Sequence, residues 1–389
     1  MATAMLLFCC IVVPLPATGH MRDAELSSQK KQAKPPAAQK KKAGLPPREN
    51  FTLAEQNVAV VPEIPDARFF ADSEADFMRV LPASPGPWLA LSSGGADGAF
   101  GAGVISGLTE SGKRPDFAMV TGVSTGALMA PFVFLGAKYD DRLREAYTTI
   151  TAADVFELGG KGESFFDTWP LRDLIAKRVT SELLHDVAAE HRRGRRLLVL
   201  TTNLDAERPV AWNMGAIAAK GGDKALKLFR DVLLAATSIP GAFPPVLIGV
   251  EAGGRTFQEM HGDGGLINQF FIAPQSLLAT TSSFRLPATD LYVVINTRLS
   301  PEFQPTERNT ISVLTRGVSV GVKTLTRIMI EQAFATAKRS GAGFYLATID
   351  PAFESPSRGA FDPDYMKALF NFGSERAKTG LAFRNEPKG

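Results

Sequence analysis

Cysteine is almost absent from this chain of 389 residues, and its placement excludes several kinds of chemistry. Its two cysteines, Cys9 and Cys10, lie within the first ten residues. A mature domain that begins after them holds no disulfide, no cysteine–zinc site and no thiol nucleophile.

Histidine is also scarce, with four residues in the chain: His20, His185, His191 and His261. His185 and His191 are six residues apart, which does not fit the three- or four-residue spacing that places two metal ligands together on a helix. We therefore expect both at the surface. The sequence predicts neither a metal site nor another cofactor.

Positive charge is concentrated in a single segment. Residues 20–49 hold eight Lys and Arg against three Asp and Glu, an excess of +5. Residues 1–19 carry no charged side chain and the whole chain carries +3, so the chain from Asn50 onward sums to −2. A nearly neutral body argues against nucleic acid as a partner. A hydrophobic content of 45% instead predicts a globular protein with a large core.

The first 19 residues are uncharged and mostly apolar, and they end in small residues at 17–19. The run is short and broken by proline, which favours a secretory signal over a membrane-spanning helix. It predicts a protein outside the cytoplasm: periplasmic, secreted or membrane-anchored. Leu7, three residues before Cys10, leaves a lipoprotein signal open. A disordered segment or a buried strand is the other alternative.

The composition of the rest of the chain predicts three further segments. The Lys- and Pro-rich residues 20–50 predict a disordered linker, with a tether to an anionic membrane surface as the alternative. The Pro-interrupted residues 51–87 predict an extension of loops and short elements. Residues 88–389 are expected to form one large domain with a helical C-terminal region.

Strand and helix patterns alternate within that domain. Short apolar runs predict strands at 88–91, 117–120, 197–200, 256–260 and 291–295. Helical patterns cover 98–110, 127–135, 226–236 and 314–329. This alternation predicts an α/β layered fold with a mainly parallel sheet. Pro131 should kink the second helix or confine it to its early turns.

A Gly-x-Ser-x-Gly pattern joins the second strand to the second helix, with Gly122, Ser124 and Gly126 at its fixed positions. In a nucleophile elbow the serine occupies a strained turn that exposes its hydroxyl, and side chains at the flanking positions would collide with the neighbouring strand and helix. Ser124 is therefore predicted to be a nucleophile. The alternative is a serine in an ordinary tight turn.

A glycine-rich loop follows the first strand and includes Gly94, Gly95, Ala96 and Gly98. Small residues let backbone N–H groups converge beside a helix N-terminus, which suits an anion such as the oxyanion of a tetrahedral intermediate. A nucleotide is the weaker alternative, because no Gly-Lys-Ser/Thr follows.

The third motif is Asp263 followed by Gly264 and Gly265, directly after the strand predicted at 256–260. An acidic residue between glycines forms a loop carboxylate that can approach another loop closely. An ordinary Asp-Gly turn gives the same local pattern.

Together these motifs resemble those of the patatin-like phospholipase family. The resemblance extends from Trp88 to Val294 and includes the segments 201–205 and 235–245. It implies a three-layer α/β/α fold and a Ser–Asp dyad without histidine. By position, Ser124 is the nucleophile and Asp263 its base.

The resemblance further implies an enzyme of lipid breakdown that cleaves carboxylic esters of phospholipids or other lipids. The backbone amides of Gly94, Gly95 and Ala96 form the oxyanion hole, and the reaction passes through an acyl-enzyme. The expected partners are a lipid or acyl-ester substrate and, transiently, a membrane surface.

Two positions depart from the family pattern. Ser93 stands where a third glycine is usual, and Asp97 stands where the family has Arg or Lys. Asp97 opens a helix, so its carboxylate is expected to cap that helix and to point away from a developing oxyanion. The loss of the basic residue also leaves open a catalytically dead lipid-binding protein.

The nearest rival mechanism is a Ser–His–Asp triad. His261 is the histidine placed late enough in the chain, with Asp205 or Asp231 as the acid. The dyad is favoured because Asp263 matches a motif and His261 does not.

Overall fold

The computed structural model describes residue 45 and residues 47–159 and 162–387. The predicted signal segment 1–19 and most of the predicted linker 20–50 lie outside the described residues.

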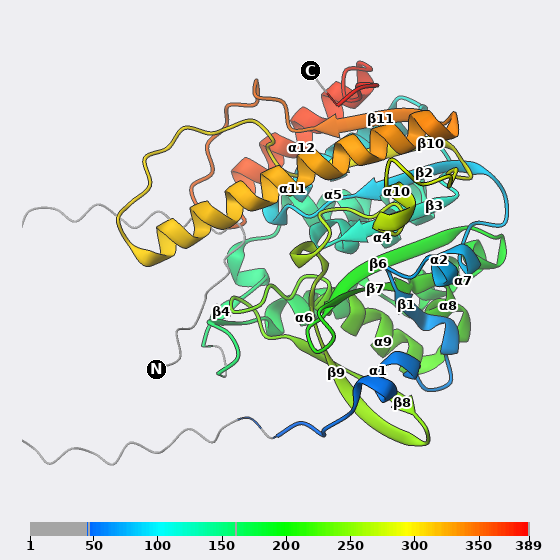
Figure 1. Cartoon of the computed structure of the whole chain (residues 1–389). Coiled ribbons are helices and arrows are strands. Elements are labelled where there is room, and N and C mark those ends of the chain that lie inside the picture. The colour runs from blue at the N-terminus through cyan, green and yellow to red at the C-terminus, as the bar shows by residue number, and fades with distance from the viewer. Residues whose placement is uncertain (1–44, 46, 160–161, 388–389) are drawn as a thin grey trace, which may run out of the picture.

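A nine-stranded sheet forms the centre of the molecule, in the order β1-β7-β6-β3-β2-β10-β11, with β9 paired to β6 and β8 paired to β9 (Figure 1). The bounds are β1 Arg68–Phe70, β2 Gly86–Leu91, β3 Met119–Val123, β6 Arg196–Asn203, β7 Arg208–Asn213, β8 Val246–Ala252, β9 Arg255–Asp263, β10 Ala288–Ile295 and β11 Gly343–Thr348. Five adjacent strands, β6, β3, β2, β10 and β11, run parallel. The predicted α/β fold with a mainly parallel sheet is therefore confirmed.

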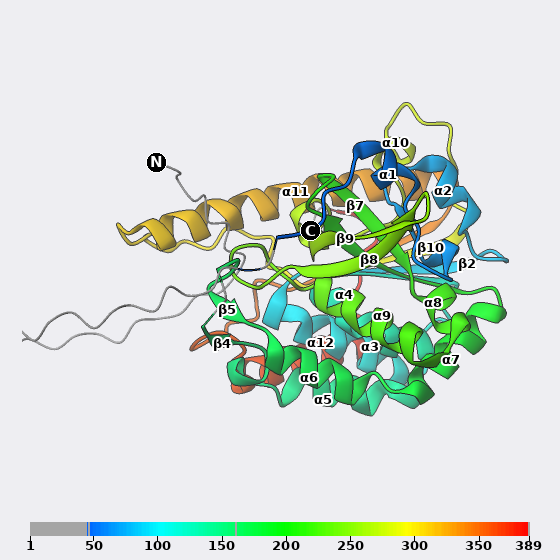
Figure 2. The same cartoon turned by 90° about the horizontal axis from the view of Figure 1, so that it is seen from below.

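Helices cover both faces of the sheet (Figure 2). Their bounds are α1 Leu53–Val58, α2 Glu74–Arg79, α3 Gly98–Glu110, α4 Thr125–Leu135, α5 Asp140–Thr148, α6 Trp169–Arg178, α7 Ser181–Arg192, α8 Met214–Lys220, α9 Gly222–Ala235, α10 Gln275–Leu278, α11 Thr310–Ser340 and α12 Pro363–Lys378. In β6, Leu197 and Val199 enter the core beneath α3–α9 and α12, and Leu198 and Leu200 enter the core beneath α11. Side chains alternate across a strand, so one apolar run supplies both cores.

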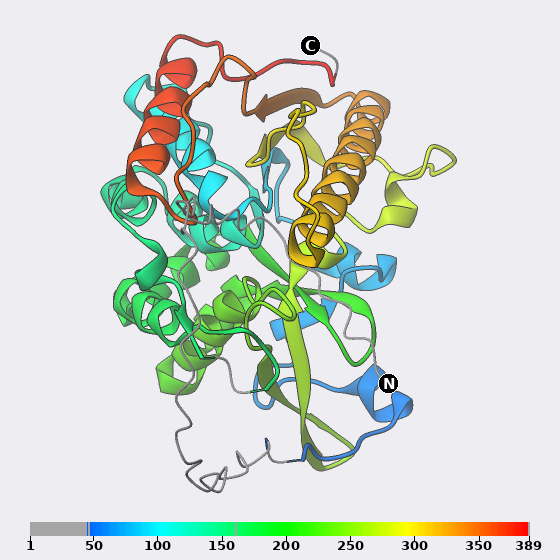
Figure 3. The same cartoon turned by 90° about the vertical axis from the view of Figure 1, so that its left-hand side faces the viewer.

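The N-terminal extension, residues 51–87, is part of this architecture. As expected, it contains short elements, namely α1, β1 and α2. Strand β1 pairs antiparallel with β7 and forms one edge of the sheet. The hairpin of β8 and β9 lies near this edge, at the far end of the molecule from α12 (Figure 3).

Two local expectations were wrong in part. Pro131 does not confine α4 to its early turns: the helix continues to Leu135, because it is buried and tertiary packing outweighs the missing N–H of proline. His185 is exposed as expected, but His191 is half-buried, since its imidazole packs closely over Gly215. Within the described residues, no helix combines the length and apolar character that crossing a bilayer requires.

Candidate active site

Ser124 occupies the turn between β3 and α4. Its backbone has φ 54° and ψ −123°, a conformation that costs a non-glycine residue free energy and persists where the surroundings enforce it. Its carbonyl accepts the first hydrogen bond of α4, from the amide of Ala127 at 2.8 Å. The serine side chain is thereby aimed out of the sheet, as a nucleophile elbow requires.

The two flanking glycines leave no room for a side chain. A Cβ on Gly122 would lie 2.5 Å from the carbonyl oxygen of Gly126, and a Cβ on Gly126 would lie 2.4 Å from that of Leu91 in β2. Both contacts are to backbone, which cannot move aside. The pattern Gly-x-Ser-x-Gly thus follows from the close approach of α4 to β3 and β2.

Asp263 ends β9 and faces the serine. The Oγ of Ser124 donates a hydrogen bond of 2.6 Å to Oδ2 of Asp263, and the amide of Gly265 donates one of 2.7 Å to Oδ1. Strand β9 reaches this point because it pairs antiparallel with the end of β6, with Asp263 opposite Thr201. Two residues 139 positions apart in the chain are therefore in direct contact.

The environment of Asp263 favours its neutral form. Burial raises the pKa of its carboxyl to about 6, and the hydrogen bonds from Ser124 and Gly265 oppose that rise. The side chain is almost fully enclosed, with 4% of the residue exposed. A carboxylate with a pKa near 6 is a better proton acceptor than an ordinary aspartate.

The glycines after Asp263 are required by packing. A Cβ on Gly264 would lie 2.7 Å from the carbonyl oxygen of Leu200 in β6. A Cβ on Gly265 would lie 3.0 Å from Oδ1 of Asp263, the oxygen that receives the amide hydrogen bond of Gly265. Bulkier residues here would displace the carboxylate from Ser124.

The glycine-rich loop lies beside the serine. Gly94 has φ 154° and Gly95 has φ 57°, and a Cβ on Gly94 would lie 2.0 Å from the carbonyl oxygen of Asn296. Gly95 lines the same pocket as Ser124. Among the described residues, no hydrogen bond uses the amide of Gly94, Gly95 or Ala96 as donor. These three N–H groups therefore remain available to an anion.

Gly98 is the fourth small residue of this loop. A Cβ at this position would lie 2.3 Å from Oγ1 of Thr125, the residue that follows Ser124. The glycine therefore lets the start of α3 approach the start of α4.

Two polar residues that the sequence analysis did not identify hold the loop in place. Asn296 donates from its backbone to Oγ of Ser92 at 2.8 Å and accepts from the amide of Gly101 at 3.1 Å. Gln269 accepts a hydrogen bond from Oγ of Ser93 and donates to the carbonyl of Gly265 at 2.6 Å. Gln269 thus links the glycine-rich loop to the Asp263 motif. Asn296 directly follows a parallel strand, a position that could have drawn attention to it.

The side chain of Asp97 contacts α12. Its Oδ1 accepts a 2.7 Å hydrogen bond from the hydroxyl of Tyr365 in α12. The expected helix cap is wrong: Asp97 makes no capping hydrogen bond, because its backbone is helical (φ −67°, ψ −9°) rather than extended. Burial raises the pKa of Asp97 to about 6.

The side-chain hydrogen bonds of His261 are to residues other than Ser124. Its ring is fully buried, with Nδ1 2.9 Å from Oγ1 of Thr201 and Nε2 3.2 Å from Oε2 of Glu259. Burial lowers its imidazole pKa. The acids proposed for the triad are also engaged elsewhere: Asp205 binds Arg48, and Asp231 binds Lys227.

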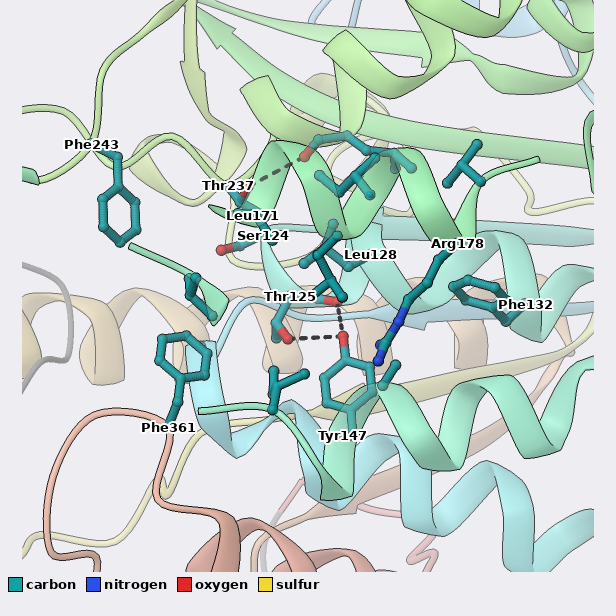
Figure 4. Close-up of a pocket in the computed structure, with 18 of the residues that line it drawn as sticks. Ser124, Thr125, Leu128, Phe132, Tyr147, Leu171, Arg178, Thr237, Phe243 and Phe361 are labelled. Carbon is teal, nitrogen blue, oxygen red and sulfur yellow. Dashed lines mark hydrogen bonds between the residues drawn. The ribbon is translucent and has the colours of Figure 1, made fainter. Parts of the chain in front are cut away.

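An apolar pocket extends from Ser124 along α4 (Figure 4). Thr125, Leu128 and Phe132 lie on one face of α4 and form one wall. The pocket encloses about 100 Å³, whereas a single water needs roughly 10–15 Å³ on the same measure. The remaining lining is mostly aliphatic and aromatic, including Leu171, Ile175, Leu233, Phe243 and Phe361. Such a cavity suits a hydrocarbon chain.

Metal ligands are not assembled near this site. Within residues 47–159 and 162–387, no group of three His, Cys, Asp or Glu side chains could hold a metal ion.

The match of a family model agrees with this geometry. The family model of patatin-like phospholipases matches residues 89–274, a range that includes the glycine-rich loop, Ser124 and Asp263. Among solved structures, VipD from Legionella pneumophila is similar at 11% sequence identity with a TM-score of 0.39, over 83% of this chain and 70% of that one. No curated protein sequence matches the chain. Residues 89–274 therefore form a patatin-like phospholipase domain, which is the domain of a lipid acyl hydrolase.

Proposed function

We propose that this protein hydrolyses carboxylic ester bonds of lipids, phospholipids among them, with Ser124 as nucleophile and Asp263 as base. The observation that carries the proposal is the 2.6 Å hydrogen bond from the serine hydroxyl to a buried carboxylate. A base must lie within hydrogen-bonding distance of the proton it removes, and this one does. No cofactor is needed for such a reaction.

In the first step, Asp263 accepts the proton of Ser124 while Oγ attacks the ester carbonyl carbon. The carbonyl oxygen becomes an oxyanion, and the amides of Gly94, Gly95 and Ala96 donate hydrogen bonds to it. Collapse of this intermediate expels the alcohol, which takes the proton from Asp263, and leaves the acyl group on Ser124. A water then attacks the acyl-enzyme with Asp263 as base and releases the fatty acid.

The base and the loop amides are expected to contribute unequally to stabilising the transition state. A pKa near 6 lets Asp263 be ionised at neutral pH and still accept a proton more readily than a free aspartate. Removing a single oxyanion-hole donor typically costs about 3–4 kcal/mol in the transition state. The loop amides are therefore expected to contribute more than the base.

Asp97 does not oppose this mechanism. A carboxylate directed at the oxyanion would raise its energy, but Asp97 is held by Tyr365 on the side of α12. Both Ser124 and Asp263 are retained and in contact, which favours an enzyme over a lipid-binding protein that has lost activity.

The test compares Ser124→Ala and Asp263→Asn with the wild type on a short-chain chromogenic ester and on a panel of lipids. Both variants should fall to background while circular dichroism stays unchanged, because the two residues act as one unit. A fluorophosphonate should label the wild type at Ser124, and Asp263→Asn should label slowly, since the oxyanion hole survives. Full activity of Ser124→Ala, or a label on another residue, contradicts the proposal.

We also propose that the enzyme acts outside the cytoplasm, on the basis of the apolar segment 1–19. Mass spectrometry of the mature protein should find an N-terminus near Gly19. An N-terminus at a diacylated Cys10 would instead support a lipoprotein anchor. A cytoplasmic protein that begins at Met1 contradicts export.

A further inference from the structure

Arg178 is the one charged side chain among the described residues that line the pocket of Ser124. It is the last residue of α6, and its side chain is 18% exposed. In Figure 4 the guanidinium of Arg178 is directed toward Tyr147, and Arg178 is drawn to the right of Ser124. A cation in the wall of a hydrocarbon pocket is costly unless something polar meets it.

The other polar side chains of the pocket wall already have partners. The hydroxyl of Tyr147 donates to the carbonyl of Thr125 at 2.7 Å, and its oxygen lies 3.0 Å from Oγ1 of Thr125. The hydroxyl of Thr237 donates to the carbonyl of Leu234 at 2.9 Å. Ser124 likewise donates to Asp263, so Arg178 is the polar side chain of the described lining that makes no hydrogen bond.

The guanidinium of Arg178 makes no hydrogen bond within the described residues, although it carries five N–H donors. Its nearest acidic group is Glu145, whose Oε1 lies 3.6 Å from one terminal nitrogen, beyond hydrogen-bonding distance. Glu145 itself is 66% exposed to water. Among the described residues, no acceptor therefore lies within hydrogen-bonding distance of these donors.

The pocket sets where along an acyl chain such an acceptor could lie. Thr125 and Phe132 are seven residues apart on α4, which corresponds to roughly 10 Å of helix. An extended chain advances about 1.2 Å per bond, so roughly eight to nine carbons fit beside this wall. Arg178 lines the same pocket, so an oxygen on the enclosed part of such a chain can reach its N–H donors.

Charge decides between an anionic and a neutral acceptor. Glu145 and Asp154 both attract the guanidinium of Arg178. A carboxylate entering the pocket would meet their repulsion, whereas a hydroxyl or keto oxygen would meet only the unused N–H donors. A neutral oxygen is therefore the better partner.

We propose that Arg178 makes the enzyme selective for acyl chains that carry a hydroxyl or keto oxygen on the part enclosed by the pocket. This inference rests on the proposed function, since it takes the pocket of Ser124 as the acyl site. Arg178 would donate a charge-assisted hydrogen bond to that oxygen, and an unsubstituted chain would leave the guanidinium without a partner.

The test uses p-nitrophenyl esters of decanoate, of 6-, 8- and 10-hydroxydecanoate, and of decanedioate. The wild type should favour at least one of the hydroxy esters over decanoate by about tenfold in kcat/KM, and should favour decanedioate over decanoate by less. Arg178→Met keeps the length of the side chain and should abolish this preference, measured as the ratio of the two kcat/KM values. Lys177→Met, which removes the neighbouring charge outside the pocket, should keep the wild-type preference.

Affinity measurements distinguish this proposal from the proposed ester hydrolysis. Ser124→Ala cannot turn over an ester, so its affinity for methyl 10-hydroxydecanoate and methyl decanoate reports the pocket alone. A higher affinity for the hydroxy ester that Arg178→Met removes supports the proposal even if no ester is hydrolysed. Equal preference in the wild type and Arg178→Met, by rate and by binding, overturns it, as does a stronger preference for the dicarboxylate.

Discussion

Ser124 and Asp263 share a hydrogen bond of 2.6 Å inside the protein, and no histidine stands between them. The serine is set by the turn from β3 to α4 and the aspartate by the end of β9. Because the contact is direct, the ionisation of one carboxyl group should govern the reactivity of the serine.

The first prediction concerns pH. The base works in its ionised form, and burial raises the pKa of Asp263 to about 6. Hydrolysis measured as kcat/KM should therefore rise with pH through about 6 and reach roughly a tenth of its plateau at pH 5. Asp97 also has a pKa of about 6, so the profile of Asp97→Asn is the control. If that variant loses the inflection, Asp97 rather than Asp263 is the group that titrates.

The second prediction separates the dyad from a triad. His261 contacts Thr201 and Glu259, so His261→Gln removes polar contacts within the sheet but no base. This variant should keep at least a tenth of wild-type hydrolysis, a loss below about 1.4 kcal/mol. Asp263→Asn should fall to background in the same assay. The reverse ranking of the two variants would refute the dyad and leave Ser124 as the nucleophile.

The third prediction tests the elbow by sterics alone. A Cβ on Gly126 would overlap the carbonyl oxygen of Leu91, so Gly126→Ala should lower the free energy of unfolding by about 2 kcal/mol or more and abolish hydrolysis. Gly317→Ala is the matched control, because that helical glycine has open space around it. Chemical denaturation should show the control to be more stable than the wild type by about 0.5–1 kcal/mol. A Gly126→Ala enzyme with wild-type activity would contradict the packing described for this turn.

The fourth prediction concerns the hydroxyl of Tyr365. Tyr365→Phe removes the donor that favours the ionised form of Asp97, so the pKa of Asp97 should rise further above its unfolded value. A carboxyl whose pKa is raised on folding destabilises the protein as pH rises, so the loss of stability should be larger at pH 8 than at pH 4.5. At pH 8 we expect about 1–3 kcal/mol by denaturation.

Hydrolysis by Tyr365→Phe should also fall, since the freed carboxylate can turn toward the glycine-rich loop. The control is Tyr292→Phe, whose hydroxyl takes part in no hydrogen bond of the described residues. Equal pH dependence of stability in the two variants would show that Tyr365 does not hold Asp97.

The sequence by itself determined the elements around the site and the three motifs. Helix α3 spans Gly98–Glu110 as predicted, and Gly122 and Gly126 mark the turn of Ser124 correctly. These features are local: a strand alternates its side chains, a helix repeats every 3.6 residues, and a strained turn admits only glycine beside it. The pattern of one short segment therefore contains the information.

The tertiary structure alone decided which distant groups meet. Asp97 is held by Tyr365, 268 residues later, instead of capping its own helix. Gln269 links two loops, and Arg178 lines a pocket to which α4, α5, α6 and α9 all contribute. Pro131 remains inside α4 because the surrounding core outweighs its local cost. Contacts between residues far apart in the chain depend on how the layers pack, and no periodicity within a segment records that packing.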